Sequence, residues 1–110
     1  LRMERSDVLA PQTAPLTEIF VDEMDGQLRQ SGVGDLLVGK QIGRLMAVLG
    51  GRMGALRTAL RTDGSLDDMV GRNVTLAGHA DVAAIAARLR DLAARLGRTD
   101  DAALMAGEIA

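Results

Sequence analysis

The sequence lacks cysteine, tryptophan and tyrosine, and it has one phenylalanine, Phe20, and one histidine, His79, among its 110 residues. Without cysteine, a disulfide scaffold, a thiolate metal site and a cysteine nucleophile are all excluded. A single histidine argues against a structural zinc site. A single aromatic side chain leaves no platform on which the bases of single-stranded nucleic acid stack. We therefore expect no metal site and no cofactor.

Long apolar runs are also missing. The longest stretch without a charged residue, residues 8–17, contains both prolines of the chain, whereas a membrane-spanning helix needs about 20 apolar residues. The basic start, apolar run and cleavage site of a secretory signal peptide are not visible. Because the chain begins with Leu1, we expect it to be a piece of a longer protein, with residues 1–14 the remnant of a preceding helix and a linker.

Apolar residues recur at spacings of three and four along nearly the whole chain, which is typical of amphipathic helices. The pattern predicts helices over residues 16–30, 36–61, 65–77 and 81–97 and a last short helix that opens at residues 99–101. Asp35 and Asp81 are residue types that cap helix N-termini, and Ser65 with Asp68 has the spacing of a capping box. No window alternates apolar and polar residues over the length of a strand. The sequence therefore predicts an all-α fold.

We expect a compact bundle of about five helices in a single domain, residues 1–110, with one long, central, glycine-rich helix. Its charge is distributed unevenly: the net charge is −4 over residues 1–39, +5 over 40–62 and −3 over 63–110. The central basic residues are Lys40, Arg44, Arg52, Arg57 and Arg61, with no acid among them. Two interpretations stay open: the acidic helix before them neutralises these charges, or they face an anionic partner.

Six of the 13 glycines lie within residues 34–54. Each glycine inside a helix costs about 0.5–1 kcal/mol relative to alanine, so these positions need a reason. Gly39, Gly43, Gly50 and Gly54 fall with Ala47 within about 80° around the helix and form a stripe of small residues, which lets another helix approach closely. The stripe either packs inside the protein or forms a groove for the helix of a partner.

A phosphate-binding loop is a third interpretation of this region. The run from Gly34 to Lys40 matches the first seven positions of the glycine-rich nucleotide motif, but Gln41 replaces the Ser or Thr that holds the magnesium ion. The motif also requires a preceding strand, whereas an amphipathic helix is predicted there. Nucleotide binding is therefore disfavoured.

Several motifs in the same region resemble the signature of the ubiquinol–cytochrome c chaperone family. They are Met24-Asp25, Leu28-Arg29, Gly32-Val33-Gly34-Asp35 and Val38-Gly39-Lys40, followed by Gly51-Arg52 and Ala59-Leu60. The resemblance covers residues 16–110. The sequence departs from the family at an aromatic pair before the Gly-Arg, where it has Leu49 and Gly50, and at a later tyrosine, where it has Leu56.

The resemblance implies an assembly factor of the respiratory ubiquinol–cytochrome c reductase and not an enzyme. Its partner would be a protein client, cytochrome b or another reductase subunit, together with the ribosome or an anionic membrane surface. No small-molecule substrate is implied. The scarcity of lysine beside twelve arginines suggests a bacterial protein, and we expect a cytoplasmic location, peripheral at the inner membrane.

The candidate binding residues follow from the stripe and the central charges. For contact with a partner they are Gly39, Lys40, Gly43, Arg44, Gly50, Arg52 and Gly54. As motif positions we select Gly32, Gly34, Asp35, Val38 and Gly51. The alternative function is a helical structural adaptor that self-associates through the glycine stripe.

Overall fold

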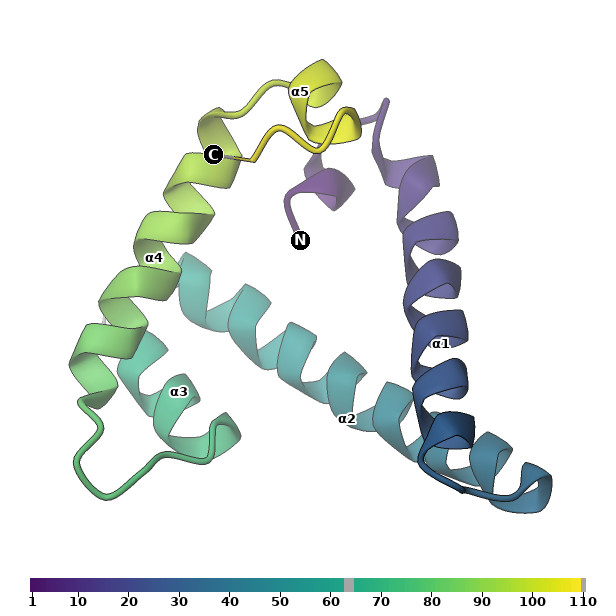
Figure 1. The fold of residues 1–110 in the computed structure, drawn as a ribbon. Coiled ribbons are helices and arrows are strands. Elements are labelled where there is room, and N and C mark those ends of the chain that lie inside the picture. The colour runs from purple at the N-terminus through teal and green to yellow at the C-terminus, as the bar shows by residue number, and fades with distance from the viewer. Residues whose placement is uncertain (63–64, 110) are drawn as a thin grey trace. The chain divides into compact units, whose positions relative to one another are not determined.

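The computed structural model describes residues 1–62 and 65–109 (Figure 1). In these ranges the chain forms two short 3-10 helices, η1 (Met3–Arg5) and η2 (Ala10–Gln12). The α-helices are α1 (Thr13–Gln30), α2 (Asp35–Arg61), α3 (Leu66–Asn73), α4 (Val82–Arg98) and α5 (Asp101–Met105). No strand is present within the described ranges. The prediction of an all-α fold with about five helices is confirmed.

The contacts of the backbone divide the chain into two compact units. We call Met3–Gly51 the N-terminal unit, and Leu1–Arg2 together with Arg52–Ala110 the C-terminal unit. Helix α2 contributes residues 35–51 to the first unit and residues 52–61 to the second.

The N-terminal unit contains η1, η2, α1 and the first part of α2. Its buried apolar side chains are Leu9 and Val38. The hydroxyl of Thr13 donates to the carbonyl of Ala10 at 2.7 Å and ties η2 to the start of α1. Helix α1 begins three residues before the predicted residue 16, because Pro15 falls in its first turn, where a missing N–H costs nothing.

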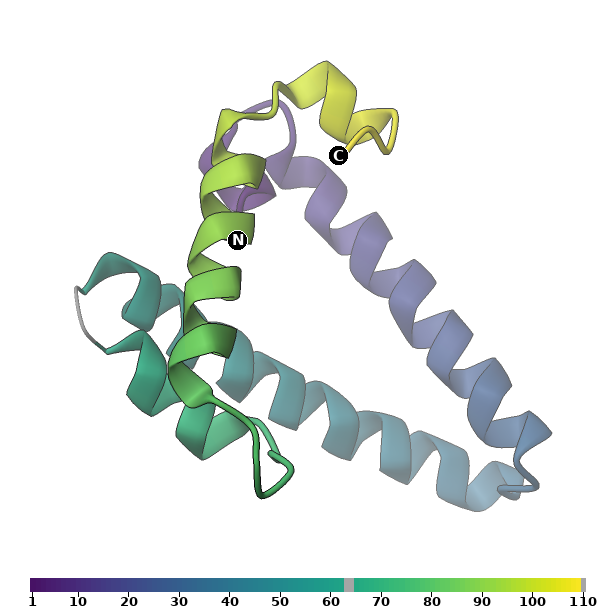
Figure 2. The same cartoon turned by 60° about the vertical axis from the view of Figure 1, so that its left-hand side comes forward.

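The core of the C-terminal unit lies where α3 packs against α4, as both views show (Figures 1 and 2). Its buried residues are Ala59, Leu66, Val70 and Ala86, and the half-buried side chains packed around them are Leu56, Met69, Val82, Ile85 and Leu89. The apolar spacing of three and four predicted in these helices therefore marks the faces that meet.

Arg2 connects the start of the chain to the end of α4 within this unit. Its guanidinium donates to the carbonyls of Leu96 at 3.1 Å and Thr99 at 3.0 Å, and it pairs with the carboxylate of Asp101 at 2.7 Å. The carbonyls at a helix C-terminus carry partial negative charge and have no partner within the helix, so a cation satisfies them well.

Of the predicted helix caps, Asp81 is confirmed and Ser65 is wrong; Asp100 caps α5 without having been predicted as a cap. Asp81 accepts a hydrogen bond from the N–H of Ala83 at 2.9 Å, and Asp100 caps α5 in the same way. Ser65 precedes α3 but makes no capping bond; its hydroxyl donates backwards to the carbonyl of Thr62 at 3.2 Å. Helix α3 ends at Asn73 and not near residue 77, because the chain turns to an extended conformation at the next residue, Val74.

Candidate functional site

The connection between α1 and α2 closes the first helix with a Schellman motif. Gly32 has a φ of +86°, a left-handed conformation that glycine adopts without steric cost. Its N–H donates to the carbonyl of Arg29 at 3.0 Å, and the N–H of Val33 donates to that of Leu28 at 3.1 Å. This pair of bonds is the pattern that ends many helices. Gly32 is thus required by the turn.

The next two motif residues start α2. The carbonyl of Gly34 accepts from the N–H of Val38 at 3.1 Å, the first bond of the new helix. Asp35 lies in the first turn, where a negative charge is favourable beside the positive end of the helix. It was predicted as the N-cap and instead lies one residue inside the helix.

Arg29 joins the two helices electrostatically. Its Nε donates to Asp25 at 2.6 Å, one turn earlier in α1, and its Nη1 forms an ion pair with Asp35 of α2. The hydrogen bond to Asp25, followed by that to Asp35, raises the pKa of the Arg29 guanidinium. Four of the predicted motif positions, Gly32, Gly34, Asp35 and Val38, therefore meet in one helical connection, and sequence reasoning missed the role of Asp25 and Arg29.

The glycine stripe faces open space. At Gly39, Gly43 and Gly50 an added Cβ would meet no heavy atom within 4 Å beyond the local helix backbone, and the same holds at Gly54 and Gly51. Internal close packing, one of the two interpretations of the stripe, requires a neighbour at contact distance. Within the N-terminal unit no such neighbour lies at Gly39, Gly43 or Gly50, so packing inside this unit does not account for these three glycines.

The basic side chains beside the stripe are also uncovered. Lys40 and Arg44 in the N-terminal unit and Arg52 in the C-terminal unit are exposed. Within the described part of the chain, Lys40 and Arg44 form no ion pair with the carboxylates of α1. The first of the two charge interpretations was that the preceding acidic helix neutralises these residues. The structure does not show this for Lys40 and Arg44.

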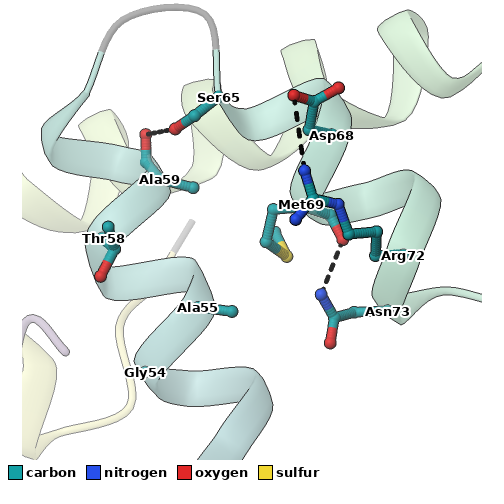
Figure 3. Close-up of a pocket in the computed structure, with 9 residues that line it drawn as sticks. All are labelled: Gly54, Ala55, Thr58, Ala59, Ser65, Asp68, Met69, Arg72 and Asn73. Carbon is teal, nitrogen blue, oxygen red and sulfur yellow. Dashed lines mark hydrogen bonds and ion pairs between the residues drawn. The ribbon is translucent and has the colours of Figure 1, made fainter.

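A pocket of about 340 Å³ opens between the last turns of α2 and helix α3 within the C-terminal unit (Figure 3). It is lined by Gly54, Ala55, Thr58, Ala59, Ser65, Asp68, Met69, Arg72 and Asn73. The small side chains of α2 leave the space, and the Met69 side chain extends into it from α3 (Figure 3).

The polar groups of this pocket are paired among themselves. Arg72 forms an ion pair with Asp68 at 3.7 Å, and the amide of Asn73 donates to the carbonyl of Met69 at 2.9 Å. Of the predicted binding residues, only Gly54 lies here. The other pocket residues were not predicted. The signal in the sequence that could have indicated the α2 wall of the pocket is the pair of small residues at 54 and 55, repeated one helical turn later at 58 and 59.

The candidate site has the features of a surface that contacts another molecule. No group of three or more metal-ligating side chains occurs among residues 1–62 and 65–109. In the same ranges, no helix has both the length and the apolar character needed to cross a bilayer. The described surface offers helix backbone without side chains at the glycines, exposed cations, and the pocket with an apolar wall between α2 and α3.

Comparison with known proteins gives a single family. Neither a curated protein nor a solved structure matches this chain. The model of the family described as ubiquinol-cytochrome C chaperone matches residues 2–110, which extends the resemblance seen over residues 16–110 towards the N-terminus. The helical connection and the uncovered stripe described above lie inside the matched region. The chain therefore belongs to the ubiquinol-cytochrome C chaperone family.

Proposed function

We propose that this protein is a non-enzymatic assembly chaperone for the ubiquinol–cytochrome c reductase, and that it holds cytochrome b or its helices during biogenesis. Membership of the chaperone family supports the general role. The observation that carries the specific proposal is the empty space beside Gly39, Gly43 and Gly50. The protein would act at the cytoplasmic side of a bacterial inner membrane.

The cost of the glycines supports a client on the stripe. Each of the three lies inside α2 and lowers helix stability by about 0.5–1 kcal/mol relative to alanine. No neighbour within their own unit offsets this cost, since nothing lies within 4 Å of the added Cβ. Close approach of a client helix, with its backbone near that of α2, would offset it.

The uncovered cations would hold an anionic partner next to the client. Lys40, Arg44 and Arg52 are exposed on α2, and charged surfaces of this kind attract lipid headgroups or ribosomal RNA. In the C-terminal unit, Gly54 and Met69 line a pocket for an apolar client side chain. Methionine suits this role because its side chain is flexible and polarizable.

Substitution of Gly43 tests the client surface. Gly43→Leu fills the stripe with a side chain that meets nothing within the protein, so the fold should be kept while the client is excluded. Tagged protein isolated from respiring cells should retain cytochrome b, and Gly43→Leu should retain at least about tenfold less, a loss of about 1.4 kcal/mol in binding.

The matched control is Gly26→Leu, which places the same side chain at another open helical glycine, in α1. It should leave cytochrome b retention unchanged. Gly43→Ala should unfold at higher denaturant concentration than the wild type, because alanine is the better helix former and nothing obstructs its Cβ. Equal retention of cytochrome b by the wild type and Gly43→Leu would remove the stripe from the proposal.

A further inference from the structure

Helix α1 has an uncovered apolar face. Leu16 is 55% exposed, Ile19 67% and Phe20 41%, and these three side chains lie within about 100° of one another around the helix. Glu23 falls inside the same arc, and Asp22 lies about 60° from Ile19. The face is therefore apolar with two carboxylates at its centre and side.

The part of α2 in the N-terminal unit has a second uncovered face of opposite charge. Leu37 is 55% exposed and Val48 44%, and both lie within about 40° of Arg44 around the helix. Lys40 lies about 60° from Leu37 on the same side. Around the helix, Gly43 lies about 60° from Lys40 and about 100° from Arg44, so the glycine stripe borders this face on its Lys40 side.

These two faces do not meet within one molecule. Helix α1 packs against η2, and it does not pack along α2, from which it diverges beyond the connection at residues 31–34 (Figure 1). The side chains of Asp22, Lys40 and Arg44 form no hydrogen bond or ion pair within the described residues. Glu23 accepts a hydrogen bond from Gln27 alone, at 3.5 Å.

We infer that a second copy of this chain covers both faces, with α1 of each copy lying on α2 of the other. The two faces complement each other. Both are apolar, and the carboxylates of the α1 face are opposite in charge to the cations of the α2 face. A two-fold axis repeats the contact, so that both faces of both copies are covered and the assembly closes. The carboxylates of Asp22 and Glu23 then pair with Lys40 and Arg44, which leaves exposed Arg52 to face the anionic surface proposed above. The inference goes beyond the proposed function and does not depend on the identity of the client.

Paired charge reversals test this arrangement. The double variant Asp22→Lys/Glu23→Lys makes the α1 face basic like the α2 face. The double variant Lys40→Glu/Arg44→Glu makes the α2 face acidic like the α1 face. Either protein alone places like charges opposite each other, so its dimer should dissociate at a concentration at least about tenfold higher than that of the wild type. Mixed together, the two variants place opposite charges at both contacts and should form a heterodimer.

Sedimentation velocity over a range of concentrations measures the association, and circular dichroism verifies that each variant is helical. The control Arg88→Glu/Arg90→Glu changes the net charge equally on exposed positions of α4 and should dimerise like the wild type. The inference is overturned by a wild type that stays monomeric, by reversals that leave the dimer intact, or by a mixture that does not associate. If Gly43→Leu abolishes the dimer while both charge-reversal variants keep it, the dimer interface lies on the glycine stripe instead.

Discussion

Arg29 near the end of α1 forms an ion pair with Asp35 in the first turn of α2, across the connection that joins the two helices. The same guanidinium donates to Asp25 at 2.6 Å. The three residues belong to the motifs through which the sequence resembles its family. In the structure they fix how one helix leads into the next, while the residues proposed to meet a client lie further along α2.

Asp35→Asn should loosen this connection in a salt-dependent way. The side chain of Asp35 is 86% exposed, so solvent and ions screen its attraction to Arg29, and the effect should be small. Amide hydrogen exchange at Val33 and Val38 should become faster at low ionic strength. At about 1 M salt, where the screening length is about 3 Å, the variant and the wild type should exchange alike. A salt-independent difference would mean that the ion pair is not the cause.

Gly32→Ala should destabilise the protein by about 1–2 kcal/mol, because the φ of +86° places a Cβ in a conformation that only glycine adopts freely. Gly26→Ala, inside α1 with open space around it, should instead stabilise by about 0.5–1 kcal/mol. Urea unfolding followed by circular dichroism measures both. The opposite signs of the two changes are the prediction, and a neutral Gly32→Ala would contradict the Schellman assignment.

Leu66→Ala should cost about 2–5 kcal/mol, since Leu66 is 1% exposed at the contact of α3 with α4 and its removal leaves a cavity. Leu92→Ala on α4 removes the same atoms from a side chain that is 40% exposed, and it should cost less than half as much. The difference in urea midpoint between these two variants checks the position of the core.

Asp81→Ala should cost about 1 kcal/mol through loss of the bond to the N–H of Ala83, which caps α4. Ser65→Ala removes a hydroxyl that caps nothing, because it donates to the carbonyl of Thr62. We expect its cost to be under half that of Asp81→Ala in the same urea measurement. Equal costs would show that Ser65 caps α3 in solution.

The fold class was predictable because helices are local. The spacing of apolar residues gave the extent of α2, residues 35–61, to within a residue, and acidic residues at 81 and 100 gave two helix starts. The end of the first helix at residue 30 was predictable for the same reason, because the hydrogen bonds that close it join Gly32 and Val33 to Arg29 and Leu28, only three and five residues earlier.

The sequence selected the candidate site residues but did not specify what surrounds them. The sequence located the stripe at Gly39, Gly43 and Gly50, but it left open whether the stripe packs inside the protein or forms a groove for the helix of a partner. The cap at Ser65 failed because its hydroxyl found a carbonyl of the preceding turn instead of the N–H groups ahead. The pocket beside Gly54 and Met69 was missed, since it depends on how α3 returns to α2.

The sequence by itself determined the all-α class, the presence of about five helices with most of their bounds, the end of the first helix before Gly32, and the resemblance to the family. Each of these follows from side-chain spacing, backbone propensity or motif within a few turns of the chain. Only the tertiary structure showed that nothing in the N-terminal unit packs on Gly39, Gly43 and Gly50, that Lys40 and Arg44 pair with no carboxylate among the described residues, and that α1 does not lie along α2. Those properties depend on contacts between residues far apart in sequence, and a helical pattern specifies which face is apolar without specifying what covers it.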